Sequence, residues 1–186
     1  MDIKQTDLYW FQLNEEIRVE DVDKFSGNNM HPDRMMTQWV LVLMISGERS
    51  FRVYGENYVV HSGEFFLLPP YVQHCGLQYD NHAAYFAHFQ ATGIQVPPPV
   101  KVDTNHILLP LHGQIPLELP CFDLMEYAIQ HRALPFFKQK FFYHPKFRRF
   151  CIRLVSLCKK ESFGVIWKAD WPTESYNILM TTKTNI

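Results

Sequence analysis

The residues of this chain best suited to binding or chemistry are an arginine and several histidines in its first half. His31 and Arg34 stand three positions apart, and His74 and His88 follow later. A guanidinium can hold a carboxylate or hydroxyl groups through its fixed fork of N–H donors. An imidazole can ligate a metal or exchange a proton near neutral pH. A lone histidine on a strand is more often a simple hydrogen-bonding group, so the spacing of these residues has to decide between the two interpretations.

The four cysteines do not add a second kind of site. They are scattered along the chain without a C-x-x-C pair, so neither a zinc knuckle nor a redox motif is visible. We interpret Cys75, Cys121, Cys151 and Cys158 as buried, reduced thiols.

The stretch from His31 to Gly76 contains the elements that position the arginine and the histidines. An apolar run rich in Val and Leu, Trp39 to Ile45, is followed by Ser46-Gly47, which predicts a buried strand that ends in a turn. Three further strands are predicted: Ser50 to Tyr54, Tyr58 to His61 and Glu64 to Leu68. Turns at Gly55-Glu56-Asn57 and Ser62-Gly63 separate them, and Pro69-Pro70 ends the last one. The result is a meander of short strands that can close as a barrel.

Further elements flank this stretch. Before it, two candidate strands, Leu8 to Leu13 and Ile17 to Val22, are followed by a predicted loop at Ser26 to Asn29. After it, a polar turn at Asp80 to His82 precedes three more predicted strands: Ala83 to Gln90, Val100 to Val102 and His106 to Leu111. After Gly113 the pattern becomes helical. Cys121 to Arg132 has apolar residues at 121, 124, 125 and 128, and Trp171 to Thr182 is a further candidate helix.

The clearest helical pattern covers Pro145 to Lys160. Its apolar residues form one stripe at helical spacing: Phe147, Phe150, Cys151, Leu154 and Cys158. This helix should pack by that stripe, either across a two-fold interface with a second copy of the chain or against the barrel.

Several motifs together identify a family. Gly63, Pro69 and His74 have the spacing of the second signature of cupin barrels, and Ser46-Gly47 lies where the first signature ends. With His31-x-x-Arg34, Trp39-Val-Leu-Val, Leu67-Leu68-Pro69-Pro70 and Ala87-His88-Phe89, residues 25 to 92 resemble the amino-terminal cupin domain of AraC-type transcriptional regulators. In that family the barrel binds a small effector, often a sugar, and the helices behind it pair two subunits.

The resemblance implies a fold and a domain organisation. We expect a mainly β chain: a cupin-like (double-stranded β-helix, jelly-roll) barrel over residues 1–113, followed by packed α-helices in a dimerisation segment over residues 114–186. The helix-turn-helix domain that binds DNA in the family has no counterpart after residue 113. DNA binding is therefore expected only through a carboxy-terminal domain outside this chain, which is either a fragment of a longer regulator or a sensor half.

The resemblance also gives the positions where enzymatic cupins hold a metal. Two histidines and a glutamate of the first signature map onto Arg34, Met36 and Val40, so only His74 keeps a ligand type. His31, His82 and His88 lack the required spacing, and a guanidinium beside His74 opposes a cation. We therefore expect no metal, no cofactor and no enzymatic activity.

The same positions predict a binding pocket. The period-2 alternation of a strand puts Arg34, Met36, Gln38 and Val40 on one face, and the cupin comparison turns that face into the barrel. The predicted ligand-binding residues are Arg34, Met36, Gln38, His74, Phe86 and His88, with Tyr85 as the alternative to Phe86. Arg34 itself has two open interpretations, a contact to a ligand or an internal salt bridge at the barrel mouth.

Three functions are compatible with these patterns. The first is a ligand-sensing and dimerising domain of a transcriptional regulator, a homodimer that binds a sugar-like molecule or a small acid. The alternative is a small metal-dependent cupin enzyme, an isomerase or dioxygenase. The third is a nucleic-acid surface on the helix Pro145 to Lys160, formed by Lys146, Arg148, Arg149, Arg153, Lys159 and Lys160, although interleaved aromatic residues are missing there.

Composition and charge narrow the choice. With 18 Lys+Arg and 19 Asp+Glu the net charge is −1, which argues against a surface that is basic as a whole. The longest apolar run is too short to span a bilayer, and the first residues lack a hydrophobic leader. These features predict a cytoplasmic protein without a membrane partner.

Overall fold

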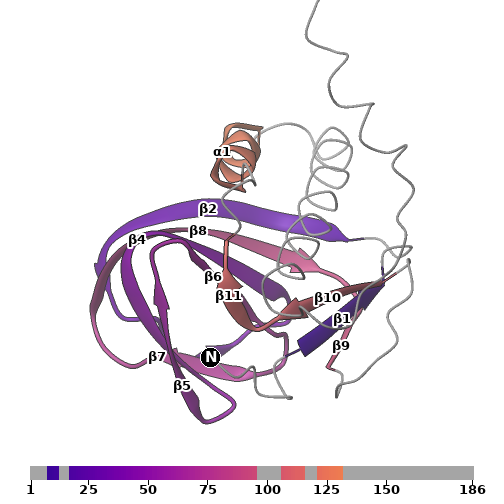
Figure 1. Cartoon of the computed structure of the whole chain (residues 1–186), viewed down its shortest axis with the longest axis horizontal. Helices are drawn as coiled ribbons and strands as arrows, with labels where there is room; N and C mark the ends of the chain where they lie inside the picture. Colours follow the sequence, from indigo (N-terminus) through magenta and orange to yellow (C-terminus); the bar gives the residue numbers. More distant parts are fainter. Residues whose placement is uncertain (1–7, 13–16, 96–105, 116–120, 132–186) are drawn as a thin grey trace, which may run out of the picture.

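The structure, a computed structural model, describes residues 8–12, 17–95, 106–115 and 121–131. These residues are mainly β, as expected, with one α-helix after the strands (Figure 1). The elements are β1 Leu8–Gln12, β2 Arg18–Asn29, β3 Arg34–Met35, β4 Trp39–Val53, β5 Glu56–His61, β6 Glu64–Leu68, β7 Gln73–Gly76, β8 Asp80–Gln90, β9 Gly93–Gln95, β10 His106–Pro110, β11 His112–Gln114 and α1 Cys121–His131. The strand predicted at 100–102 and the helices predicted at 145–160 and 171–182 lie outside the described residues.

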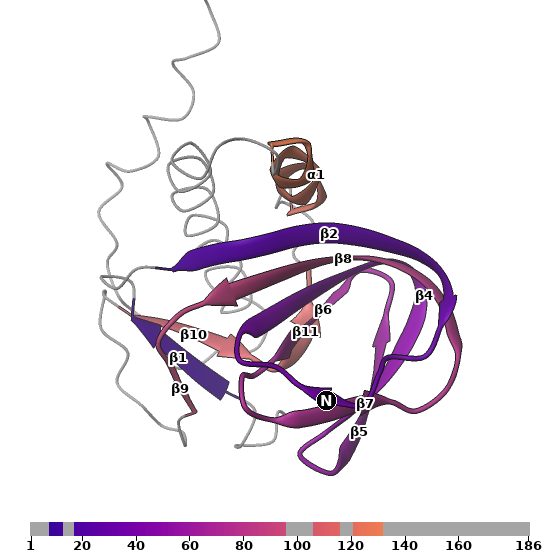
Figure 2. The ribbon, with the colours of Figure 1, turned by 180° about the vertical axis from the view of Figure 1, so that it is seen from behind.

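Strand β4 is the element that two groups of strands share. Its first half pairs with β6 on one side and with β8 on the other, and β2 extends that sheet beyond β8. Its second half pairs with β5 and, at its end, with β7, which in turn pairs with β3. The two groups therefore meet along one strand, and the long strands β2, β4 and β8 curve together in both views (Figures 1 and 2).

Strand β4 bends at Gly47. The register between β4 and β8 shifts between Met44 and Ser46, which marks a β-bulge. Gly47 has φ +74°, and a Cβ placed on it would lie 2.2 Å from the backbone oxygen of Asn81 in β8. Only glycine combines this conformation with such a close approach of two backbones.

The strands β2, β4 and β8 differ from the prediction at three segments. Ser46-Gly47 is not a turn between two short strands, because the chain continues through it as one strand of 15 residues. Ser26 to Asn29 is not a loop but the end of β2, and Asp80 to His82 is the start of β8 rather than a turn. Each polar segment stays extended because β2 pairs with β8 along this whole length, from Ser26 opposite Ala83 to Asn29 opposite Asp80.

Other predicted elements are confirmed. Strand β6 has the predicted bounds and ends at the two prolines, and β5 returns after a tight turn at Tyr54 and Gly55, whose φ values are 53° and 78°. Helix α1 begins at the predicted residue and extends to His131, the last residue that the structure describes. Its apolar face is buried at Cys121, Met125 and Ala128, as the spacing predicts.

Helix α1 and a small second sheet cover one face of the β6–β4–β8–β2 sheet. Side chains at every second position of β4, Trp39, Leu41 and Leu43, are buried on this outer face. The ring of Trp39 lies 4.8 Å from that of Phe11 in the β10–β1–β9 sheet, and the ring of Tyr85 lies 5.9 Å from that of Phe122 in α1. Figures 1 and 2 show α1 above β2 from both sides.

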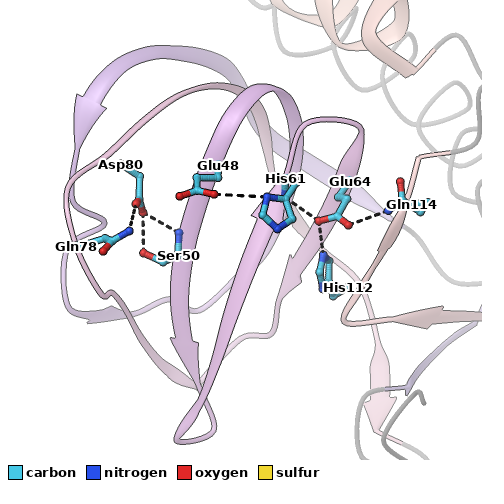
Figure 3. Close-up of polar contacts among 8 residues, drawn as sticks. All are labelled: Glu48, Ser50, His61, Glu64, Gln78, Asp80, His112 and Gln114. Atoms are coloured by element: carbon cyan, nitrogen blue, oxygen red, sulfur yellow. Dashed lines mark hydrogen bonds and ion pairs between the residues drawn. The ribbon is translucent and has the colours of Figure 1, made fainter. Parts of the chain in front are cut away.

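Two carboxylates join strands that are distant in the sequence (Figure 3). Asp80 Oδ2 accepts hydrogen bonds of 2.7 Å from both the backbone N–H and the hydroxyl of Ser50, and Gln78 donates to Oδ1 at 2.9 Å. Glu64 accepts from His112 at 2.9 Å and from Gln114 at 2.8 Å, which attaches β11 to the edge of β6.

The described part of the chain contains no helix of the length and apolar character that crossing a membrane requires.

The bend at Gly47 generates a stability prediction. Gly47→Ala should lower the free energy of unfolding by about 3 kcal/mol or more, because left-handed strain adds to a clash with the backbone of β8. Gly63→Ala is the matched control: Gly63 has φ +83° but no atom within 4 Å of the added Cβ, so only about 1 kcal/mol of strain is expected. Urea denaturation of both variants measures the difference. Equal losses would show that the contact with Asn81 does not constrain β4.

Candidate functional site

The face of β4 opposite to α1 is lined by aromatic and apolar residues from both groups of strands. Val42 lies opposite Phe86 of β8 and Phe66 of β6, and residues opposite each other share a face. The ring of Phe66 stacks on that of Phe51, from the second half of β4, at 5.0 Å and 3°. This stack brings the two groups of strands together, and we call the surface that they enclose the inner face.

Arg34 and His74 lie next to each other on two short strands. Arg34 of β3 is the register partner of His74 of β7, which is itself opposite Val53 of β4. His31 joins them, because its ring lies 5.1 Å from that of His74 and 5.3 Å from that of Phe51. The structure therefore groups Arg34, His31 and His74 at the inner face.

A glycine makes room for His31. The backbone N–H of Gly76 donates to the backbone oxygen of His31 at 2.9 Å, and a Cβ on Gly76 would lie 2.6 Å from the backbone nitrogen of His31. Any other residue at position 76 would push His31 away from the ring of Phe51.

Two buried polar atoms of this group have no hydrogen-bond partner. They are Nε of Arg34 and Nε2 of His74. A buried donor or acceptor left without a partner costs about 1–3 kcal/mol, so such atoms are rare in folded proteins.

The nearby carboxylates are engaged elsewhere. Glu20 accepts from Gln38 at 2.6 Å and from Gln90 at 2.7 Å. Asp33 accepts a hydrogen bond from Gln73, and Asp80 binds Ser50 and Gln78. Among the described residues Arg34 forms no ion pair with a carboxylate.

The histidines around Arg34 are held in their neutral form. Burial lowers the pKa of His31 to about 3, against the backbone hydrogen bond to Pro32, and the charges of Arg49 and Arg34 lower it further. Burial and the charge of Arg34 also lower the pKa values of His74 and His88. None of these rings carries a positive charge at neutral pH, and none supplies a negative one.

Arg49, a second buried cation, is satisfied within the protein. Its guanidinium donates to Asn29 at 2.7 Å and also contacts Nε2 of His82. Burial lowers the pKa of Arg49 to about 10, whereas the nearby charge of Asp80 acts to raise it. Arg34 has no comparable set of partners.

The structure brings together four of the six predicted ligand-binding residues. Arg34 and His74 are register partners, the charge of Arg34 acts on His88, and the ring of Phe86 lies 5.7 Å from that of His88. Val40, next to Met36 and Gln38 in the predicted pattern, lies opposite His88 on the same face.

Met36 and Gln38 lie between two strands, because β3 ends at Met35 and β4 begins only at Trp39. Both side chains are half-buried, as that of Arg34 is, and Met36 packs against the core. The backbone oxygen of Met36 accepts from the N–H of Tyr71 at 2.7 Å, and Gln38 is bound to Glu20. Both residues belong to the segment that leads from one group of strands to the other.

Two alternatives for the site can now be assigned. Tyr85 does not line the inner face: its hydroxyl donates to Glu126 of α1 at 2.8 Å, and burial together with Glu126 raises its pKa to about 12. The internal salt bridge considered for Arg34 is absent from the described residues. The sequence singled out His31 through the motif His31-x-x-Arg34 but did not place it among the ligand-binding residues, and Arg49 was not singled out at all.

Within the described ranges, no three or more His, Cys, Asp or Glu side chains are arranged so that they could hold a metal ion. The predicted dimer-interface residues lie outside those ranges; they are Phe147, Phe150, Cys151, Leu154 and Cys158.

Residues 22–90 match the family model of the AraC-like ligand binding domain. The match runs from within β2 to the end of β8 and so includes every residue grouped at the inner face. The resemblance to the amino-terminal cupin domain of AraC-type regulators is thus confirmed for this segment. No curated protein matches the chain.

Several solved structures, one of them named as a cupin, have some likeness to this chain. An RmlC-like cupin from Shewanella frigidimarina is 19% identical, with 48% of this chain and 79% of that chain covered and a TM-score of 0.32. The DMSP lyase DddQ from Ruegeria pomeroyi is 13% identical, with 50% and 54% covered and a TM-score of 0.33. YhaK from Escherichia coli is 14% identical, with 57% and 52% covered and a TM-score of 0.32. Likenesses at this level do not indicate what the chain binds.

The buried neutral His31 generates a pH prediction. Between its ordinary pKa near 6.5 and about 3, the unfolded chain binds a proton that the folded chain does not, so stability falls as the pH falls through this range. His31→Phe should flatten the loss between pH 6 and pH 4 by about 1 kcal/mol per pH unit. Urea denaturation at several pH values measures both slopes, with the range from pH 7.5 to 8.5 as the control. Identical slopes below pH 6 would contradict the assignment.

Proposed function

We propose that this AraC-like ligand binding domain senses a small-molecule effector, which it binds at the inner face without a metal. The observation that carries the proposal is the pair of buried, partnerless atoms Nε of Arg34 and Nε2 of His74. Both cost free energy in the ligand-free protein, and a ligand with matching polar groups would recover it.

The surroundings of these atoms support binding of an organic molecule. Small-molecule sites combine apolar and aromatic walls with a few polar groups that fix orientation. Here Val40, Phe86 and Phe66 provide apolar and aromatic surface on the same face, and Arg34, His74 and His88 provide the polar groups.

We favour binding over catalysis because of the residue types at the positions that hold metal in enzymatic cupins. Arg34, Met36 and Val40 stand there, and none of these side chains is suited to a divalent ion. A metal-dependent isomerase or dioxygenase is the second candidate.

The regulatory part of the proposal extends beyond the described residues. The apolar stripe of residues 147–158 would pair two subunits, and DNA contacts would come from a carboxy-terminal domain of a longer regulator, acting in the cytoplasm. Support for these statements comes from the sequence pattern and from the matched family model.

A thermal-shift screen of sugars, sugar acids and small organic acids tests the sensing function. An effector at about 100 times its Kd should raise Tm by about 5–10 °C. Phe86→Ala should reduce the shift because it removes an aromatic surface beside His88, whereas Tyr79→Ala, at a side chain that is 71% exposed, is the matched control.

The outcomes of the screen separate the candidates. A stabilising compound that NMR finds unchanged after incubation with the protein and added Mn²⁺, Fe²⁺ or Zn²⁺ supports a sensor. Conversion of that compound only in the presence of a metal would favour the enzyme, and the absence of any stabilising compound would contradict the sensing function.

Sedimentation velocity tests the dimer. The full chain should sediment as a dimer at micromolar concentration, and Leu154→Glu should convert it to a monomer, because a buried charge disrupts an apolar interface. Lys146→Glu, off the stripe, is the control. A strict monomer for the unaltered chain would remove dimerisation from the proposal.

A further inference from the structure

We propose that the effector is a hydroxycarboxylic acid, whose carboxylate binds the guanidinium of Arg34 and whose hydroxyl donates a hydrogen bond to Nε2 of His74. This inference rests on the proposed sensing function and names the chemistry of its ligand.

The charge of Arg34 calls for an anion. No ion pair joins Arg34 to a carboxylate among the described residues, and the carboxylates of Asp33 and Glu20 accept hydrogen bonds from glutamine side chains. A partly buried guanidinium binds a carboxylate through two parallel N–H donors, of which Nε is one. A neutral sugar would accept these hydrogen bonds but leave the charge uncompensated.

Arg49 shows how the same fold treats a cation that is structural. Arg49 is 6% exposed, and Asn29, His82 and the nearby carboxylate of Asp80 surround its guanidinium. Arg34 lies on the same protein with none of these partners. The difference indicates that Arg34 is kept for a molecule from outside the chain.

Nε2 of His74 favours a ligand that donates a hydrogen bond. Nδ1 of the same ring lies 2.9 Å from the backbone oxygen of Val72, and this contact is a hydrogen bond only if Nδ1 carries the proton. In the neutral ring Nε2 is then an acceptor, and it is buried without a partner. An ammonium group would be repelled by Arg34 nearby, so a hydroxyl is the donor that fits both residues.

The two contacts belong to one small molecule. Arg34 and His74 are opposite each other on paired strands, which places their Cβ atoms about 5 Å apart. A carboxylate and a hydroxyl on the same or neighbouring carbons can reach both. Val40 of β4 and Phe86 of β8 provide an apolar surface on the same face, against which the rest of the ligand would pack.

Two series of probes test the inference by calorimetry on the full chain. The first series is mandelate, phenylacetate, which lacks the hydroxyl, and mandelamide, which lacks the charge. The second is galacturonate and galactose. In at least one series the hydroxy acid should bind about tenfold more tightly than each counterpart, because an unpaired polar group in the site penalises the incomplete ligand.

Two variants assign the contacts. Arg34→Gln should weaken the hydroxy acid at least tenfold and abolish its advantage over the uncharged counterpart. His74→Phe should abolish the advantage of mandelate over phenylacetate and leave phenylacetate binding unchanged. Arg52→Gln is the matched control, because Arg52 donates to Asn57 in an exposed hydrogen bond away from the inner face, and its affinities should equal those of the unaltered chain.

The results distinguish this inference from the proposed function. If galactose or another neutral compound binds as tightly as its acid, or if acid binding survives Arg34→Gln, the hydroxy acid is wrong and the sensing function stands. If neither the probes nor the broader screen contain a ligand, both are wrong.

The melting temperature of the ligand-free protein tests the inference independently of the probes chosen. In a buffer whose only anion is chloride, Arg34→Met should raise Tm by about 2–5 °C, because it removes a partly buried, uncompensated charge. Arg52→Met should not raise Tm. A decrease or no change for Arg34→Met would show that the guanidinium is already satisfied in the ligand-free protein, which would overturn the inference.

Discussion

The structure depends on the bend of β4 at Gly47. Because one strand pairs with β6 and β8 in its first half and with β5 and β7 in its second, the two groups of strands face each other instead of forming one open sheet. The backbone of β8 lies so close to Gly47 that no side chain fits between them. The stack of Phe51 on Phe66, and with it the inner face, follows from that approach.

Buried polar groups near the bend are hydrogen-bonded to one another, unlike two polar atoms at β3 and β7. Near the start of β8, Asp80, Ser50, Arg49, Asn29 and His82 satisfy one another, and burial there rigidifies the junction of β2, β4 and β8. At β3 and β7, by contrast, Nε of Arg34 and Nε2 of His74 have no hydrogen-bond partner among the described residues. Arg49 is thus buried and hydrogen-bonded, whereas Arg34, at the candidate site, is only half-buried and has one nitrogen without a partner. The lowered pKa values of His31, His74 and His88 keep that site free of further positive charge.

The comparisons and the geometry address different levels of function. Residues 22–90 match the AraC-like ligand binding domain, and the solved structures, at 13–19% identity and TM-scores of 0.32–0.33, add nothing about what the chain binds. The chemistry of the effector has to come from the side chains, since one barrel accommodates many ligands. In the proposed site, the partnerless atoms of Arg34 and His74 would supply that chemistry.

The sequence by itself determined the elements whose signals are local. The turn at Ser62-Gly63 and the prolines after Leu68 predicted the bounds of β6, and the apolar spacing predicted α1. The spacing of Gly63, Pro69 and His74 indicated the family. Sequence-based prediction failed at Ser46-Gly47, Ser26–Asn29 and Asp80–His82, where turn-forming residues stay extended because pairing between distant strands overrides local preference. Which side chains meet was decided only by the tertiary structure. The register partner of Arg34 and the hydrogen-bond partners of Arg49 and Tyr85 come from strands and a helix 20 to 41 positions away. No local pattern records whether a charged side chain finds a partner.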